Sequence, residues 1–139
     1  MTVMEAVREY LAACPLLAGG MLNVDFLPAE AASYSVEAVP VQPVVKRYID
    51  GSELRRFAFV LATRSYYGEH IRSQLDNLAF FDEFGDWLDA QNRAGQLPVL
   101  DAPCSASRLE VTSSGYAFAP DTDTARYQIQ CQLEYYRQA

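Results

Sequence analysis

The stretch DTDTARYQIQCQLEYY, residues 121–136, decides how the rest of the chain is interpreted. From Tyr127 onward, apolar and polar side chains alternate without interruption, so each set shares one side of an extended chain. A period of two over this length predicts a β-strand with one face on a core and the other toward water. The polar positions include Gln128, Gln130 and Gln132. Because Gln donates and accepts hydrogen bonds without carrying charge, this face is either a solvated sheet surface or a polar contact surface.

A β-hairpin is predicted in the middle of the chain. Two β-type runs, residues 44–49 and 54–64, are joined by Asp50, Gly51 and Ser52. An Asp-Gly pair between two such runs is a strong short-range hairpin signal. The second run is apolar on both of its faces, which predicts a central strand covered on two sides.

Two helices are expected. Thr2 and Glu5 fit a capping box, so a first helix should begin there and stop near Pro15. A second, long amphipathic helix is predicted from about residue 68 to about residue 92, because apolar residues recur every three or four positions. Two shorter helices that meet near Asn77 would fit this pattern equally. The predicted apolar face comprises Ile71, Leu75, Leu78, Phe81, Phe84 and Leu88, with Trp87 beside them.

The remaining segments complete the predicted fold. Shorter strands are expected over residues 22–27, 33–39, 108–112 and 116–118, with a loop over residues 97–107. This order implies an α+β fold, a mostly antiparallel sheet with the N-terminal helix and the long helix packed on it. With 139 residues, the chain is expected to be a single domain, residues 1–139.

Composition excludes several classes of function. The net charge is −7 and the sequence pI is near 4.6, which argues against binding nucleic acid through clustered basic residues. No run of apolar residues is long enough for a membrane span, and no signal peptide is expected at the N-terminus. Three cysteines without metal-ligand spacing fit buried thiols in a reducing cytosol. We therefore expect a cytosolic protein.

No catalytic, metal-binding or cofactor-binding signature is predicted. The single histidine, His70, would have to meet a cysteine through the fold to form a nucleophilic pair. The candidates for that cysteine are Cys14, Cys104 and Cys131. The acids of the long helix, Asp82, Glu83, Asp86 and Asp89, have the spacing of a solvated helix face. The segment DTDT at residues 121–124 lacks the remaining positions of a calcium loop.

Tyrosine is in surplus, with nine in the chain. Tyrosine offers a large amphipathic contact area and is enriched in protein interfaces. In the pair Tyr135 and Tyr136, neighbouring strand positions point to opposite faces, so Tyr136 is expected to be exposed. The tyrosines are either ordinary sheet-face residues with wet hydroxyls or part of a self-association surface. The candidate interface residues are Asp50, Gly51, Ser52, Gln128, Gln130, Gln132 and Tyr136.

Nearly the whole chain resembles a known family. The resemblance is carried by VVKRYIDGSELRRFAFVLATRSYYG (residues 44–68), FFDEFGDWLDAQNRAGQLP (residues 80–98) and TSSGYAFAPDTDTARYQIQCQLEYY (residues 112–136). These stretches resemble the minor capsid proteins of phages and prophages of Gram-positive bacteria, which are similar to the tail terminators of long-tailed phages. The last stretch is long and is the most specific of the three.

The resemblance implies a non-enzymatic role in virion assembly. Tail-terminator-like proteins are small α+β subunits that form a ring, usually a hexamer, at the head-proximal end of the tail tube. The implied partners are further copies of the chain, the tail tube protein and the head connector protein, with no cofactor and no membrane. DNA would only pass through the ring lumen. The implied locations are the host cytoplasm during assembly and then the virion.

Other functions remain open at this point. Within the same class, the chain is a candidate for a head–tail connector or a minor capsid subunit. From another class, a small-molecule-binding protein or enzyme would use a cleft between the long helix and the sheet. That function would require polar groups to converge around His70, Cys104 and residues 121–124. A regulatory partner-binding domain of the host is a third possibility.

Overall fold

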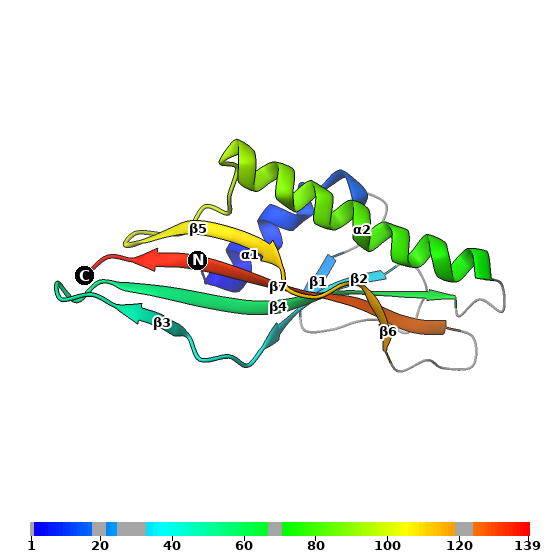
Figure 1. Cartoon of the computed structure of the whole chain (residues 1–139), viewed down its shortest axis with the longest axis horizontal. Helices are drawn as coiled ribbons and strands as arrows, with labels where there is room; N and C mark the ends of the chain where they lie inside the picture. Colours follow the sequence, from blue (N-terminus) through cyan, green and yellow to red (C-terminus); the bar gives the residue numbers. More distant parts are fainter. Residues whose placement is uncertain (1, 18–21, 25–32, 67–70, 119–123) are drawn as a thin grey trace.

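The computed structural model describes residues 2–17, 22–24, 33–66, 71–118 and 124–139. Within these ranges the chain forms an α+β fold with a mostly antiparallel sheet (Figure 1). The helices are α1 (Val3–Ala12), η1 (Pro15–Leu17) and α2 (Ile71–Ala94). The strands are β1 (Leu22–Val24), β2 (Ser33–Val39), β3 (Val44–Arg47), β4 (Glu53–Tyr66), β5 (Cys104–Val111), β6 (Tyr116–Phe118) and β7 (Thr124–Arg137).

Two long strands form the centre of the sheet. β4 and β7 each have 14 residues and pair antiparallel along their whole length, from Glu53 opposite Arg137 to Tyr66 opposite Thr124. The alternation of β7 explains this position, because its apolar residues lie opposite those of β4 in the pairs Phe59–Cys131 and Leu61–Ile129. The predicted hairpin, central strand and final strand are therefore confirmed.

Two outer strands pair with each of the two central strands. Along the edge of β4 that faces away from β7, β3 and β2 pair with successive parts of the strand. β5 and β6 pair in the same way with successive parts of β7, along its edge away from β4. β1 extends the sheet by pairing parallel with β2. Bulges interrupt β3 next to Val45 and β5 next to Ser107. Near the β3–β4 turn, the sheet is thus four strands wide, in the order β3-β4-β7-β5.

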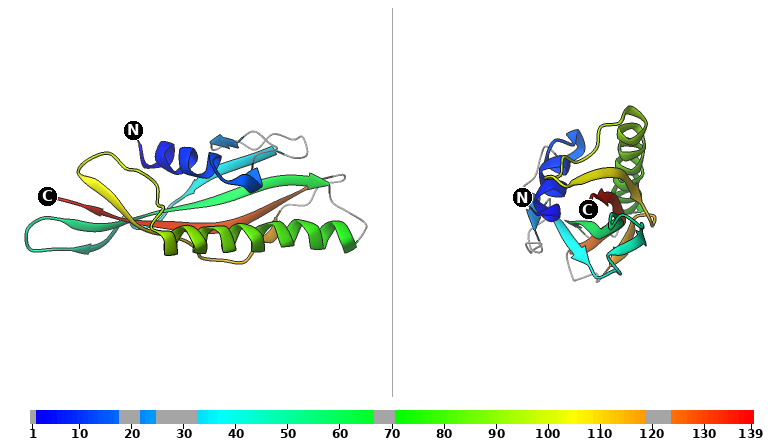
Figure 2. Two further views of the ribbon diagram at one scale, coloured as in Figure 1. Left: turned by 90° about the horizontal axis from the view of Figure 1, so that it is seen from above. Right: turned by 90° about the vertical axis from the view of Figure 1, so that its left-hand side faces the viewer.

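Both helices cover one face of the sheet. Figure 2 shows α1 over the β1–β2 side and α2 over the β5 side. α1 begins as predicted, because the Thr2 Oγ1 atom accepts a hydrogen bond from the Glu5 backbone N–H at 3.1 Å. The two helices touch through Tyr10 and Trp87, whose ring centroids are 5.5 Å apart.

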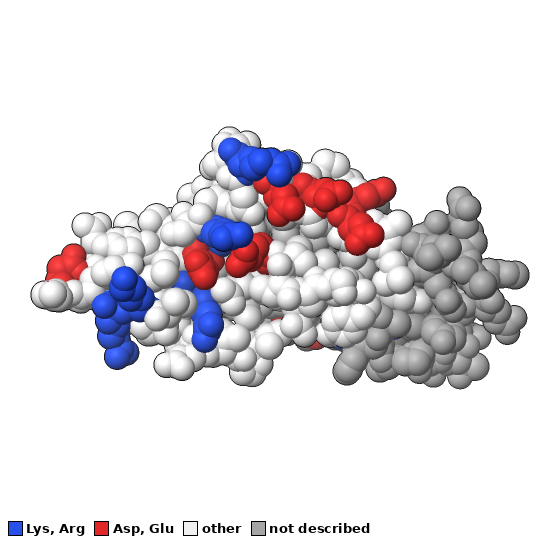
Figure 3. Space-filling model, in the orientation of Figure 1, with Lys and Arg blue, Asp and Glu red and all other residues white. Residues whose placement is uncertain are grey.

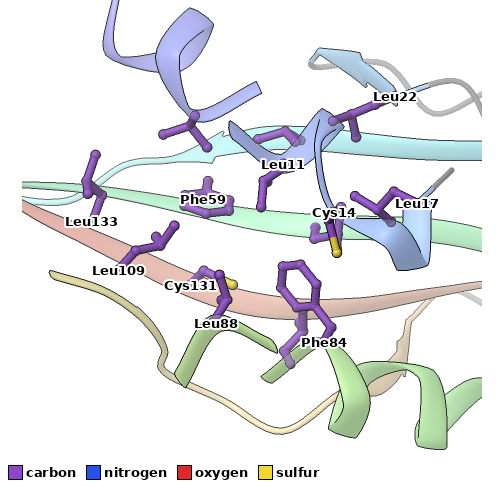
Figure 4. Close-up of a cluster of buried hydrophobic side chains, with 14 of the residues drawn as sticks. Leu11, Cys14, Leu17, Leu22, Phe59, Phe84, Leu88, Leu109, Cys131 and Leu133 are labelled. Carbon is purple, nitrogen blue, oxygen red and sulfur yellow. The ribbon is translucent and has the colours of Figure 1, made fainter. Parts of the chain in front are cut away.

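The core lies between the helices and the sheet (Figure 4). Phe81, Phe84 and Leu88 of α2 are buried there, at 1% exposure or less. The view in Figure 4 shows how α1 and the strands complete this cluster, with Leu11, Cys14, Leu17, Leu22, Phe59, Leu109, Cys131 and Leu133. The outer face of the central strand is also covered, since Val60 and Ala62 are buried. The prediction that β4 is covered on two sides is confirmed at these positions.

Two sequence expectations need correction. Leu78 is predicted on the buried face of the long helix, yet 38% of it is exposed, so the buried part of this face is limited to Phe81, Phe84 and Leu88 among the described side chains. The predicted loop over residues 97–107 ends earlier, since β5 begins at Cys104 and pairs with the end of β7. Of the two arrangements that the sequence left open, α2 is the single continuous helix. The predicted strand over residues 22–27 is described only as β1, and the rest of it lies outside the described residues.

Candidate functional site

The candidate interface residues fall into two separate groups. Asp50, Gly51, Ser52 and Tyr136 gather at the turn between β3 and β4. The three candidate glutamines lie further along the same sheet face of β7, and two of them contact Tyr116. The sequence placed both groups on the surface of one sheet, but it did not indicate how far apart they are.

The first group is built around a tight turn. Tyr48 and Ser52 close the turn through a backbone hydrogen bond of 2.9 Å. Gly51 has a φ of +90°, a conformation that is strained for residues with a Cβ. The Asp50 carboxylate accepts hydrogen bonds from both the backbone N–H and the hydroxyl of Ser52. These bonds lower the pKa of Asp50 below its usual value, with the Ser52 hydroxyl as the largest cause.

Charged residues brace the strands that lead into the turn. Glu53 accepts hydrogen bonds from Arg47 at 3.1 Å and from Arg55 at 3.0 Å, and these lower its pKa. The side chain of Arg47 remains 76% exposed. Lys46 lies over the Tyr48 ring at 5.2 Å. The strands that lead into the turn therefore carry three basic side chains, of which Arg47 and Arg55 pair with Glu53 and Lys46 lies over Tyr48.

Tyr136 joins the turn from the neighbouring strand. Its ring lies 6.2 Å from that of Tyr48. Together with Ile49, Asp50 and Ser52, the two tyrosines line an open hollow of about 450 Å³. Tyr136 is only partly exposed, because Tyr48 covers one side of its ring.

The strands β3 and β4 and their turn form an arm at one end of the molecule. We use this name for residues 44–55, and Figures 1 and 2 show that they extend beyond both helices. Exposed apolar residues concentrate on and just before the arm: Val39, Val41, Val45, Tyr48 and Ile49. Ile49, at the tip, is fully exposed. Such a grouping of apolar side chains on a projecting element is typical of an interaction surface.

The glutamine group is less accessible than its alternation suggests. Gln128 is buried, and its Nε2 atom donates to the Tyr116 hydroxyl at 2.6 Å. Gln130 is exposed and reaches the same hydroxyl at 3.2 Å. Gln132 is half-buried and donates to Glu134. Sequence alternation identified the face correctly, but the Tyr116 side chain of the neighbouring strand β6 contacts part of it, and no local sequence pattern indicated this contact.

A second hollow, which the sequence did not indicate, lies between α2 and the β5–β6 connection. Its volume is about 270 Å³. Apolar residues contribute to its lining, namely Phe81, Val111 and Ile129, together with Gly85 and Gly115. Four acids also line it, Asp82, Asp86, Asp89 and Glu110. We call it the acidic hollow.

Close packing of a glycine shapes the acidic hollow. A Cβ atom built on Gly115 would lie only 2.6 Å from the Phe81 Cδ2 atom, so the chain can pass directly over the Phe81 ring only with glycine here. The predicted solvated face of α2 borders the hollow, and Figure 3 shows acidic residues gathered over this helix. Within the described part of the chain, Asp82, Asp86 and Asp89 have no cationic partner.

The candidate catalytic residues do not converge in the part of the chain that is described. Cys14 and Cys131 are buried in the core, and burial raises the pKa of both thiols. Cys104 lies on β5, where it pairs with Arg137 rather than lining the acidic hollow. His70 and residues 121–123 lie outside the described residues. Among the described side chains, no group of three or more His, Cys, Asp or Glu is arranged to hold a metal ion.

The described helices include none that is long and apolar enough to cross a membrane. No protein-family model matches the chain, and no curated protein matches it.

Proposed function

We propose that the chain is a non-enzymatic phage virion assembly protein, a tail terminator that forms a ring at the head-proximal end of the tail tube. The observation that carries this proposal is the arm, which projects beyond the core and presents exposed apolar side chains. A projecting arm can only bury these side chains against another molecule. When the receiving surface lies elsewhere on an identical subunit, the contact is heterologous, and such contacts generate rings.

The sequence resemblance adds the phage setting to this proposal. In a tail-terminator-like arrangement, α1 and the long amphipathic helix α2 pack on one face of the sheet and leave the arm free. The partners are then further copies of the chain, the tail tube protein and the head connector protein. DNA contacts the ring only while it passes through the lumen. The subunits assemble in the host cytoplasm and remain in the virion.

Capping of tail tubes tests the terminator function directly. The tail tube protein of the same phage is polymerised with and without the chain, and tube lengths are measured by negative-stain electron microscopy. A terminator shortens the length distribution and appears as a ring on one tube end only. Unchanged tube lengths, with the chain bound instead to portal or connector rings, would reassign it as a head–tail connector.

Light scattering coupled to size-exclusion chromatography provides the assembly state. A hexamer-sized species at high protein concentration is expected. Ile49→Ser should reduce this species, while Val99→Ser should not, because Val99 is similarly exposed but lies outside the arm. Equal effects of both substitutions would contradict an assembly role for the arm.

A further inference from the structure

The arm tip and the acidic hollow have complementary surfaces. The tip presents the fully exposed Ile49, and Lys46 and Arg47 stand on the strand that leads to it. The hollow combines apolar lining residues with the acids of α2. Figure 3 shows acidic residues along α2, with basic residues at one end of this helix, and basic residues on the arm, with an acidic residue at its end. Ile49 and Lys46 therefore have the chemistry that the hollow would bind, while the neighbouring Asp50 carboxylate is engaged by the N–H and the hydroxyl of Ser52.

The arm tip of one copy cannot reach the acidic hollow of the same copy. Tyr136 lines the hollow at the tip, and Ile129 lines the acidic hollow, seven positions earlier on the same strand. At about 3.3 Å per residue, the two sites are roughly 23 Å apart along β7. Both strands of the arm are held in the sheet, because β3 pairs with β4 and β4 pairs with β7. The arm can therefore reach such a hollow only on a second molecule.

The charges involved are available for an intermolecular contact. In the described part of the chain, Lys46 has no carboxylate partner, and its ammonium group lies over the Tyr48 ring. The acids Asp82, Asp86 and Asp89 are exposed and likewise have no cationic partner among described side chains. Opposite charges left without internal partners on two surfaces favour and orient the approach of two copies.

The edge of β5 offers no equally open alternative. Asn92 of α2 accepts from the Leu109 N–H at 3.1 Å and donates to the Leu109 carbonyl. The backbone of β5 is thereby occupied at this position, which disfavours the addition of another strand. The bulge next to Val45 likewise disrupts the edge of β3. Side-chain contact between arm and hollow is thus favoured over pairing of strand edges.

We propose that the arm tip of one copy docks into the acidic hollow of a second copy, with Ile49 entering the hollow and Lys46 facing the carboxylates of Asp82 and Asp86. The contact is head-to-tail, so each copy offers one arm and one hollow. This inference rests on the self-association proposed above and names its contact, but it does not depend on the phage setting.

Charge reversal of each side, followed by mixing, tests this contact. Lys46→Glu and Asp86→Lys should each weaken self-association by at least tenfold in sedimentation velocity. In a 1:1 mixture, the reversed arm of one variant meets the reversed hollow of the other. The unmodified arm and hollow also remain complementary. Association should therefore return in the mixture as alternating assemblies, and also in the Lys46→Glu/Asp86→Lys double variant.

The matched control is Glu9→Lys, which reverses an exposed acid on α1, away from the hollow. It should associate like the unmodified chain. When it is mixed with Lys46→Glu, the reversed arm should still find no complementary hollow, so Lys46→Glu should only end assemblies and not alternate within them. Circular dichroism shows whether each variant is folded. If a reversal variant fails to fold, Ile49→Ser and Gly85→Ala replace it, because they alter the tip and the hollow without changing charge. Each of these should weaken association.

The outcomes separate this contact from the proposed ring. Rings that persist unchanged in both reversal variants would overturn the contact and leave the terminator proposal standing. Restoration in the mixture without closed rings would keep the contact and contradict the ring. If Lys46→Glu alone weakens association, the arms pair with each other and the hollow is not involved. An unmodified chain that stays monomeric at about 1 mM would overturn the contact outright.

Discussion

At the scale of single residues, two glycines of the acidic hollow respond oppositely to a methyl group. Gly115 has the Phe81 ring directly against it, whereas a Cβ on Gly85 would meet only the Val111 Cγ2 atom at 3.8 Å. The first glycine is required by close approach of the chain. The second sits in the middle of α2, where glycine is a poor helix former.

Gly115→Ala should therefore destabilise the protein by about 1–3 kcal/mol, because the added carbon overlaps Phe81 and forces the β5–β6 connection away from α2. Gly85→Ala is the matched control and should stabilise the helix by about 0.5–1 kcal/mol. Urea unfolding followed by tryptophan fluorescence measures both. If Gly115→Ala left the free energy of unfolding unchanged, the β5–β6 connection would be able to shift without loss of stability.

Two buried thiols and the half-buried Tyr10 predict a loss of stability at alkaline pH. Burial raises the pKa of Cys14 and Cys131 above their ordinary 9.0, and it raises the pKa of Tyr10 to about 12. These groups stay protonated in the folded chain at a pH where the unfolded chain has already released their protons. Deprotonation thus favours unfolding, and the free energy of unfolding should fall above a pH of about 9.

Urea unfolding between pH 7 and pH 10.5 measures this decline. Cys131→Ala should flatten it, although it lowers stability at every pH by leaving a cavity. In the native protein, iodoacetamide at pH 8 should label Cys104 but neither buried thiol, as counted by mass spectrometry. A pH profile unchanged by Cys131→Ala would mean that this thiol does not cause the decline.

At the scale of elements, one side chain ties the end of α2 to the sheet. The Asn92 amide both accepts from and donates to the Leu109 backbone, so it replaces the strand partner that β5 lacks on that side. Asn92→Ala should cost about 1–3 kcal/mol, because both backbone groups lose their partner. Asn92→Asp should keep the bond from the Leu109 N–H, since its carboxylate can still accept, but it should leave the Leu109 carbonyl without its donor.

Hydrogen exchange of the Leu109 amide measures this attachment. Its protection should fall strongly in Asn92→Ala and only partly in Asn92→Asp. Protection that stays the same in both variants would indicate that packing of Leu88 and Leu109, rather than the amide, fixes the end of α2.

Elements with an unbroken local pattern could be predicted from the sequence, while their partners could not. The alternation after Tyr127 predicted β7, and the Asp50-Gly51 pair predicted the turn of the arm. The start of β5 at Cys104 could not be predicted, because residues 104–107 form a strand only by pairing with the end of β7. The burial of Gln128 could not be predicted either, because it depends on a contact with Tyr116, which lies twelve positions earlier in the chain.

At the scale of the whole molecule, the charges are distributed along its length. In the arm, the basic residues Lys46, Arg47 and Arg55 outnumber Asp50 and Glu53, whereas acidic residues prevail along α2 (Figure 3). This separation predicts salt-sensitive self-association, since ions screen exposed charges beyond about 10 Å at 0.1 M ionic strength. This prediction depends on the acidic hollow. The hollow could not be predicted from the sequence, because its residues come from three separate segments of the chain.

The association constant should fall by about 3- to 10-fold between 0.05 and 0.5 M NaCl, measured by sedimentation equilibrium. Lys46→Ala should associate more weakly at low salt and respond less to added salt. Association that strengthens with salt would instead indicate a purely apolar contact, because high salt favours burial of apolar surface.

The pairing of β4 with β7 also has a consequence during protein synthesis. The two strands are neighbours in the sheet, yet more than fifty residues separate each paired position in the chain. A nascent chain therefore exposes the apolar residues of β4 until residue 137 has left the ribosome, and long-range pairing of this kind is slow. The acidic hollow needs Ile129 of that last strand as well. A translating chain thus has an arm before it has a hollow, and no copy can accept a neighbour before its own synthesis has passed β7.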